Sequence, residues 1–202
     1  MTLIANPLVA DGLAVVGGYL LGSIPFGVIA TRLGGAGDLR QIGSGNIGAT
    51  NVLRTGRKDL AAATLVLDAL KATAAVVAAY NLFGEPTMLA GAAGAFFGHL
   101  YPVWLRFHGG KGVATFLGGS IFICWQAALA FVVVWLGTAA ITRYSSAAAL
   151  AASVVTPAAM LAFGYQPAAI VFAALAALLW VRHSANIARL LAGTETKIGK
   201  KG

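Results

Sequence analysis

The stretch Gly112–Thr142, GVATFLGGSIFICWQAALAFVVVWLGTAAIT, runs for 31 residues without a charged side chain. A helix that crosses a bilayer needs about 20 mostly apolar residues, so this length allows one tilted span or two short ones. Lys and Arg are enriched on the cytoplasmic side of membrane proteins. Arg106 and Lys111 precede the stretch and Arg143 follows it, so an even number of crossings keeps all three on that side. We therefore predict two helices here, at about 112–124 and 127–142.

The composition of the whole chain is that of a membrane protein. Of 202 residues, 59% are apolar and 10% are charged, whereas soluble domains carry roughly 25% charged residues. One small core cannot bury so much apolar surface. The single cysteine, Cys124, excludes a secreted module held together by disulfides, and the mean hydropathy of +0.84 excludes intrinsic disorder. We predict an all-α integral membrane protein with several spans.

Charges and turn residues divide the rest of the chain into further apolar segments. The longest, Tyr144–Val181, contains Gly164-Tyr165-Gln166-Pro167, where Gly and Pro favour a turn between two helices. With the N-terminus outside and the C-terminus cytoplasmic, every Lys and Arg except Lys71 lies at or near the cytoplasmic face. A six-helix alternative would place Arg143 outside. We predict one membrane domain, residues 1–202, with seven transmembrane helices at about 12–32, 60–80, 87–105, 112–124, 127–142, 146–163 and 168–191.

The longest predicted cytoplasmic segment, residues 34–54, reads GGAGDLRQIGSGNIGATNVLR. Glycines spaced in this way allow consecutive backbone N–H groups, including that of Gly45, to converge on an anion. A flexible Gly-rich linker is the alternative, but a linker needs neither the asparagines nor the arginine. We predict a phosphate-binding loop in which side-chain donors come from Ser44, Asn46, Thr50, Asn51 and Arg54.

A second glycine-rich segment, Gly109-Gly110-Lys111-Gly112, comes just before a predicted helix. Helix N-termini attract anions, and the lysine adds a point charge. The segment does not match a nucleotide-binding P-loop, because Leu105 stands where its first glycine should be and Gly112 where Ser or Thr should bind magnesium. We expect a phosphate site; the alternative is that Arg106 and Lys111 only anchor a helix end to anionic lipid.

Two shorter cytoplasmic segments carry polar side chains. Arg143-Tyr144-Ser145-Ser146 is, taken alone, an ordinary sequence for a membrane interface. Near the C-terminus, helical spacings of three and four place one polar stripe on one face, and Glu195 follows it. The stripe consists of Arg182, His183, Asn186 and Arg189. A functional role for this stripe is better supported because it shares a membrane face with the two glycine-rich segments.

Asp68 and Lys71 lie inside a predicted span, one helical turn apart. Unpaired charges are costly at this depth, so the two side chains should neutralise each other and point into the bundle. We expect either a purely structural pair or support for the site from below.

The predicted cytoplasmic face has few acidic residues, namely Asp38, Asp59 and Glu195. These are too few and too scattered for a magnesium-dependent phosphotransferase, so we expect neither a metal nor another cofactor. The net charge of +8 gathers beside the spans, which favours lipid headgroups and anionic substrates over nucleic acid. Two function classes remain: an enzyme that joins a phosphate-bearing soluble substrate to a lipid, and a transporter of a small phosphate-bearing organic anion.

Three segments together resemble the three motifs of the bacterial acyl-phosphate:glycerol-3-phosphate acyltransferases, the PlsY family. They are GSGNIGATN (43–51), GGKGVAT (109–115) and RHSANI (182–187), in the order that the family has them. The seven-helix count also agrees with that family. Ile47 stands where many members have proline, a difference that concerns the stiffness of the loop.

The resemblance implies transfer of a fatty acyl group from acyl phosphate to the 1-hydroxyl of sn-glycerol 3-phosphate, giving lysophosphatidic acid and inorganic phosphate. This reaction is the first acylation of phospholipid synthesis, and it implies a multi-pass protein of the bacterial cytoplasmic (inner) membrane, which we expect to work as a monomer with its active site on the cytoplasmic face.

The resemblance also implies roles for individual residues. Ser44, the backbone of Gly45, and Ser145 or Ser146 would hold the acyl-phosphate headgroup. Arg54 and Lys111 would hold glycerol 3-phosphate, and His183 and Asn186 would orient the attacking hydroxyl or the developing oxyanion. Glu195, Asp68 and Lys71 are expected to give structural support. The remaining expected substrate-binding residues are Asn46, Thr50, Asn51 and Gly110.

Overall fold

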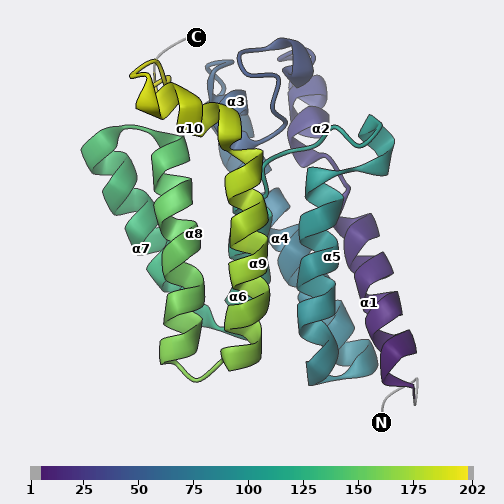
Figure 1. Ribbon diagram of the computed structural model, residues 1–202. Coiled ribbons are helices and arrows are strands. Elements are labelled where there is room, and N and C mark those ends of the chain that lie inside the picture. Colours follow the sequence, from purple (N-terminus) through teal and green to yellow (C-terminus); the bar gives the residue numbers. More distant parts are fainter. Residues whose placement is uncertain (1–5, 200–202) are drawn as a thin grey trace.

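The computed structural model describes residues 6–199, and within this range it is a helical bundle without strands (Figure 1). Its α-helices are α1 Pro7–Gly22, α2 Phe26–Leu33, α3 Ala49–Leu53, α4 Lys58–Phe83, α5 Met88–Leu100, α6 Val113–Ile123, α7 Trp125–Thr142, α8 Ser145–Ala162, α9 Gln166–Arg182 and α10 Ser184–Leu191. Short 3-10 helices cover Leu39–Gln41, Glu85–Thr87 and Val103–Leu105.

The lengths and hydropathies of these helices are those of an integral membrane protein, as predicted. In the described range, five helical stretches are long and apolar enough to span a membrane: Pro7–Leu33, Lys58–Phe83, Glu85–Leu105, Trp125–Thr142 and Ser145–Ala162. The bent pair α9 and α10 would be a sixth if it counts as one span. Helix α6 has only 11 residues, so the seven-span count stays a prediction.

The first predicted helix, 12–32, is not continuous. Helix α1 ends at Gly22 and α2 begins at Phe26. Pro25 lies in the break, where it lacks a backbone N–H and disfavours helical geometry for the residue before it. The predicted span lies within one apolar stretch, Pro7–Leu33, but Pro25 breaks the helix inside it.

The last predicted helix, 168–191, is also divided. Helices α9 and α10 meet at His183 with a bend of 62°. Helix α10 thereby lies across the top of the bundle in Figure 1, and the side chains of the predicted polar stripe do not continue along one straight helix.

The 31-residue apolar stretch contains two helices, which meet at Cys124. The residues at the start of α6, Gly112 and Val113, line the same cavity as Ser145 at the start of α8 and Asn186 on α10. In Figure 1, α7 rises to the end of the bundle that carries α10. The segment before α6 and the turn between α7 and α8 therefore lie at the same end of the molecule.

Small residues allow α1 and α5 to pack very closely. A Cβ atom at Gly22 would overlap the backbone of Ala95, and one at Gly98 would overlap the carbonyl oxygen of Tyr19. The hydroxyl of Tyr19 also donates to the carbonyl of Tyr101, at 2.8 Å. Close backbone contact is a common way to hold helices together in lipid. Here it fixes the end of α5, which the second glycine-rich segment contacts.

Candidate active site

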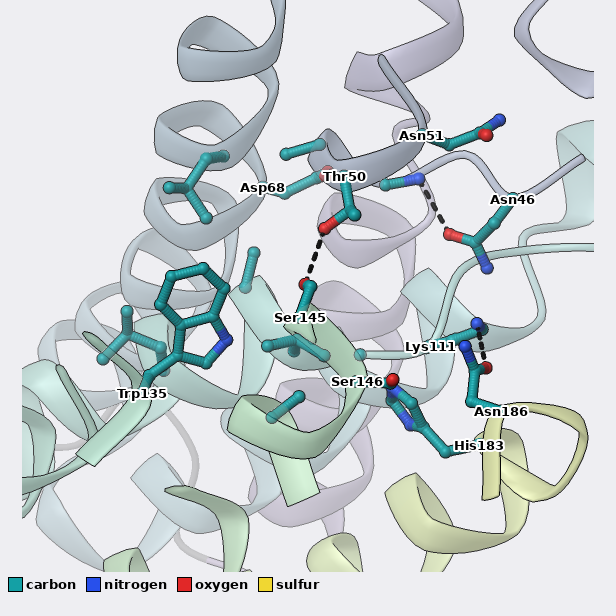
Figure 2. Close-up of a pocket in the computed structure, with 18 of the residues that line it drawn as sticks. Asn46, Thr50, Asn51, Asp68, Lys111, Trp135, Ser145, Ser146, His183 and Asn186 are labelled. Carbon is teal, nitrogen blue, oxygen red and sulfur yellow. Dashed lines mark hydrogen bonds between the residues drawn. The ribbon is translucent and has the colours of Figure 1, made fainter. Parts of the chain in front are cut away.

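One cavity opens at the α10 end of the bundle and gathers residues from four polar segments of the sequence (Figure 2). Its polar lining comes from α3 and the loop before it, from one side chain each of α4 and α5, from the segment before α6, and from the start of α8. The α9–α10 bend, α10 and the segment after α10 complete it. The predicted site residues that line it are Ser44, Asn46, Thr50, Asn51, Arg54, Asp68, Lys111, Ser145, Ser146, His183, Asn186 and Glu195. The structure thus brings nearly the whole predicted set together.

Asn51 organises the first glycine-rich loop. Its side chain is buried, and its Oδ1 accepts hydrogen bonds from the backbone of Ser44 at 3.1 Å and from Nη1 of Arg54 at 3.2 Å. Its Nδ2 donates to the carbonyls of Leu39, at 3.1 Å, and Ile42, at 2.9 Å. Because the whole amide is engaged within the loop, Asn51 holds Ser44 and Arg54 at the cavity.

Two further bonds shape this side of the cavity, and both are drawn in Figure 2. The side-chain oxygen of Asn46 accepts from the backbone of Gly48 at 2.9 Å. The hydroxyls of Thr50 and Ser145 are 2.9 Å apart. The second bond joins the first loop to the start of α8, although the two residues are far apart in the sequence.

Lys111 reaches across the cavity to Asn186. Its ammonium donates to Oδ1 of Asn186 (Figure 2), and Nδ2 of Asn186 donates to Oε1 of Glu195 at 2.6 Å. Amide groups can be turned either way, but here the carboxylate accepts only from the nitrogen. The amide oxygen therefore faces the lysine.

Glu195 joins the C-terminal segment to this group. Its carboxylate also accepts from the hydroxyl of Ser146 at 2.8 Å and from Nε of Arg189 at 2.6 Å. Burial raises the pKa of Glu195, but the hydrogen bonds from Asn186, Ser146 and Arg189 outweigh it, so the pKa lies below its usual value. Glu195 therefore acts as a charged tie between α8 and α10.

The ammonium of Lys111 lies in a partly buried position. Burial is the main cause that lowers its pKa to about 8. The negative charge of Glu195 raises this pKa, and the positive charges of Arg189 and Arg54 lower it further. An anion beside it would offset the loss of water and favour the charged form. Lys111 and Arg54 give the polar end of the cavity two cationic side chains.

His183 lies at the bend between α9 and α10 and is buried. Its Nδ1 is 2.8 Å from the carbonyl oxygen of Leu179. A carbonyl oxygen can only accept, so Nδ1 carries the proton and donates. In the neutral ring, Nε2 is then a hydrogen-bond acceptor. An acceptor at the cavity is what an attacking hydroxyl group requires.

The other half of the cavity is apolar. It is formed by side chains of α4, α6, α7 and α8 and is continuous with the polar half. Trp135 lies on this side in Figure 2. The apolar lining residues are Leu65, Val113, Ala114, Leu117, Phe131, Val132, Trp135, Leu136 and Ala149.

Three predicted residues, Gly45, Gly110 and Lys71, are not among the lining residues. Gly45 lies in the first loop with a φ of 67°, a conformation that favours glycine. Gly110 is buried next to Lys111, and Lys71 lies behind Asp68. These three shape the surroundings of the cavity.

Sequence reasoning missed His99, which lines the cavity, and the apolar residues of α7 around Trp135. His99 is ten residues before Gly109, and its polar side chain in an apolar run was the available signal. In the described part of the chain, no three His, Cys, Asp or Glu side chains come together in a group that could hold a metal ion.

Comparison with known proteins identifies the family. The family model described as glycerol-3-phosphate acyltransferase matches residues 12–193. The chain belongs to the glycerol-3-phosphate acyltransferase family. A glycerol-3-phosphate acyltransferase of Mesorhizobium japonicum is 60% identical over 190 residues, which cover 94% of this chain and 97% of that protein. One from Brucella ovis is 59% identical over 189 residues, covering 94% of each.

Solved structures of the glycerol-3-phosphate acyltransferase family show the same fold. The crystal structure of PlsY, an integral membrane glycerol 3-phosphate acyltransferase, in its glycerol 3-phosphate form matches with a TM-score of 0.88 and 38% identity. The match covers 94% of this chain and 96% of that one. The lysophosphatidic acid form gives a TM-score of 0.86 and 36% identity, covering 94% and 95%. The resemblance that the three motifs carry is thereby confirmed.

Proposed function

We propose that this member of the family transfers a fatty acyl group from acyl phosphate to the 1-hydroxyl of sn-glycerol 3-phosphate. The products are lysophosphatidic acid and inorganic phosphate. Acylation of glycerol 3-phosphate is the activity for which the family and its members are named. The alternative left by the sequence, a transporter of phosphate-bearing anions, is not the activity for which these relatives are named.

The observation that carries the proposal is the division of a single cavity into a cationic and an apolar half. Arg54 and Lys111 face the polar end, and the apolar lining of α4, α6, α7 and α8 begins directly beside it. A phosphate-bearing headgroup suits the first half and a fatty acyl chain the second. A site of this kind brings a soluble substrate and a lipid-like substrate to one point.

Glycerol 3-phosphate binds between Lys111 and Arg54. The Lys111 ammonium has three N–H donors, of which one is bonded to Asn186. The other two remain for a phosphate oxygen. Charge-assisted bonds of this kind are stronger than bonds between neutral groups, so the two cations supply most of the affinity for the acceptor substrate.

The acyl-phosphate headgroup binds at the hydroxyl groups of Ser44, which Asn51 holds next to Arg54, and of the Thr50–Ser145 pair. Ser146 takes a secondary part, because its hydroxyl already donates to Glu195. The glycine-rich loop around Gly45 and Asn46 approaches this headgroup through backbone N–H groups.

In the transfer step, the 1-hydroxyl oxygen attacks the acyl carbonyl carbon, and the bond from that carbon to the phosphate oxygen breaks. Nε2 of His183 accepts a hydrogen bond from the hydroxyl and aligns it, and Asn186 supports the polar centre. Phosphate is a good leaving group, so no acyl-enzyme is needed. The proton that the hydroxyl loses leaves with the products, since a phosphate oxygen can accept it.

The cavity lies at the cytoplasmic face of a seven-span protein of the bacterial inner membrane, with the N-terminus outside. Arg54, Arg182 and Arg189 lie near enough to act on the Lys111 ammonium, and such a gathering of Lys and Arg on one side supports this orientation. A single chain supplies all the proposed site residues, which supports a functional monomer.

Replacing Lys111 by Ala tests the assignment of the glycerol 3-phosphate site. A charge-assisted hydrogen bond contributes about 1.5–3 kcal/mol, so Lys111→Ala should lower kcat/KM for glycerol 3-phosphate by roughly tenfold to a hundredfold or more. The KM for acyl phosphate should change much less. Steady-state kinetics of the purified protein with each substrate varied in turn would measure both values.

Lys58→Ala is the matched control, because Lys58 is an exposed lysine at the start of α4, outside the cavity. If a lysine only anchors the protein to anionic lipid, the two variants should behave alike. Unchanged kinetics for glycerol 3-phosphate in a well-inserted Lys111→Ala protein would contradict the assignment.

A further inference from the structure

Asp68, Lys71 and His99 form a buried polar cluster below the cavity. The Lys71 ammonium donates to Oδ1 of Asp68 at 2.6 Å, to Nδ1 of His99 at 3.1 Å and to the carbonyl of Ile24 at 2.8 Å. All three of its N–H donors are therefore used. The Asp68 and Lys71 side chains are each 2% exposed and that of His99 is 3% exposed, so the cluster is closed to solvent except where Asp68 and His99 reach the cavity.

The cluster is a costly way to hold helices together. A buried ion pair contributes little net stability compared with apolar side chains of similar volume, and charges within a membrane protein most often mark a functional region. The backbone carbonyl of Ile24 lies at the break between α1 and α2. Lys71 thus connects that break, its own helix α4 and the end of α5. An ion pair with Asp68 alone would need only the contact within α4.

His99 in turn carries the second glycine-rich segment. Its carbonyl accepts from the backbone of Gly110 at 3.0 Å, and the next carbonyl, that of Leu100, accepts from Gly109 at 3.2 Å. A Cβ atom at Gly110 would overlap Nε2 of the His99 ring, and one at Gly109 would overlap the His99 carbonyl oxygen. The Gly109–Gly110 backbone therefore packs directly against the main chain and the ring of His99.

Arg182 holds the same peptide from the opposite side. Its Nη2 donates to the carbonyl of Gly110 at 3.2 Å, and its guanidinium lies 5.4 Å from the centre of the Tyr101 ring. The Gly110 backbone is therefore fixed between the ends of α5 and α9. The residue that follows is Lys111, whose ammonium must cross the cavity to Asn186.

We propose that Asp68, Lys71 and His99 are positioning residues that set the place of Lys111 through the backbone of Gly109 and Gly110. This inference rests on the proposed role of Lys111 in binding glycerol 3-phosphate. The cluster fixes the His99 ring, the ring and carbonyl fix Gly110, and Gly110 fixes the start of the lysine side chain. None of the three needs to touch glycerol 3-phosphate.

A double-mutant cycle between His99→Asn and Lys111→Ala tests the proposal. The Asn oxygen can replace Nδ1 as an acceptor from Lys71, whereas the part of the ring that lies on Gly110 is lost. His99→Asn alone should raise the KM for glycerol 3-phosphate by roughly tenfold, with the KM for acyl phosphate within about twofold of its original value. In the Lys111→Ala background, His99→Asn should change the KM for glycerol 3-phosphate by less than about twofold, because residues that act through one another are not additive.

Two further variants make the outcome decisive. Thr156→Val removes a buried hydroxyl on α8, bonded to the Ala152 carbonyl at 2.9 Å, and should leave the KM for glycerol 3-phosphate within about twofold of its original value. If His99→Asn does not accumulate in membranes, Asp68→Asn, which preserves the shape of the cluster, takes its place in the cycle with the same expected result.

Equal effects of His99→Asn with and without Lys111 would overturn the positioning role while leaving the proposed function intact. A Lys111→Ala protein with normal KM for glycerol 3-phosphate would instead remove the proposed role of Lys111, and the positioning role with it. Only failure of the unchanged protein to form lysophosphatidic acid would remove the proposed function.

Discussion

At the scale of single residues, Asn186 has one defined orientation because its two amide atoms have different partners. Glu195 accepts from its nitrogen, so its oxygen must face Lys111. Glu195 is held in turn by Ser146 and Arg189. The predicted support role of Glu195 therefore has a structural basis: a carboxylate on the C-terminal segment orients an amide at the cavity, which in turn receives the lysine ammonium.

The lowered pKa of Lys111 predicts a specific pH dependence. Below its pKa of about 8 the side chain is charged and can bind phosphate, and above that pH the charge is lost. The KM for glycerol 3-phosphate should therefore rise several-fold from pH 8 to pH 9. In Lys111→Arg the guanidinium stays charged throughout this range, so KM should be nearly constant, even if its absolute value is higher. Equal slopes for the two proteins would refute this explanation.

Part of the site could be predicted from the sequence, because it lies in segments whose composition is unusual for a membrane protein. The glycine-rich loops and the polar stripe supplied nearly all of the polar lining. The polar side chain of His99 in an apolar run was a signal, but its place at the site depends on contacts between helices: Lys71, with which it bonds, is 28 residues away. The same holds for Asn51, whose four partners reveal a loop-shaping role that spacing alone does not show.

At the scale of the elements, hydropathy located the apolar helices, whereas local backbone chemistry decided where they break. Pro25 separates α1 from α2, and the bend at His183 turns α10 across the bundle. Hydropathy averaged over a stretch of sequence does not reveal either change of helix direction. The bend matters for function, since it brings His183, at the bend itself, and Asn186, on α10, to one cavity.

The α6–α7 pair gives a prediction about topology. Because Lys111, before α6, and Ser145, after α7, line one cavity with Asn186 of α10, positions before α6 and after α7 should lie on the same, cytoplasmic, side. With Cys124 replaced by Ser, single cysteines at the exposed residues Phe107 and Arg143 should both resist an impermeant thiol reagent in intact cells. Both should react after the cells are permeabilised.

A cysteine at exposed Glu85, at the other end of the bundle, is the matched control and should react in intact cells. Opposite behaviour of the Phe107 and Arg143 positions would mean that the pair crosses the membrane an odd number of times. The seven-span prediction would then be wrong, and the six-helix alternative would gain support.

At the scale of the whole molecule, the bundle brings polar segments that are distant in the sequence together at one end, next to the apolar half of the cavity. Residues 44–54, 111, 145–146 and 183–196 contribute to one cavity, which they can do only because α9 bends and α6 and α7 double back. Among the described residues two carboxylates line the cavity. Glu195 is engaged by three donors, and Asp68 is paired with Lys71. Such a site is suited to anionic substrates and offers little to a divalent ion.

The most direct test of the central claim is the stoichiometry of the reaction with purified protein. With acyl phosphate and labelled glycerol 3-phosphate, we predict lysophosphatidic acid and inorganic phosphate in equal amounts, at a rate that excess chelator does not change. Acyl phosphate that yields no lysophosphatidic acid, or a reaction that strictly requires added magnesium, would contradict the account.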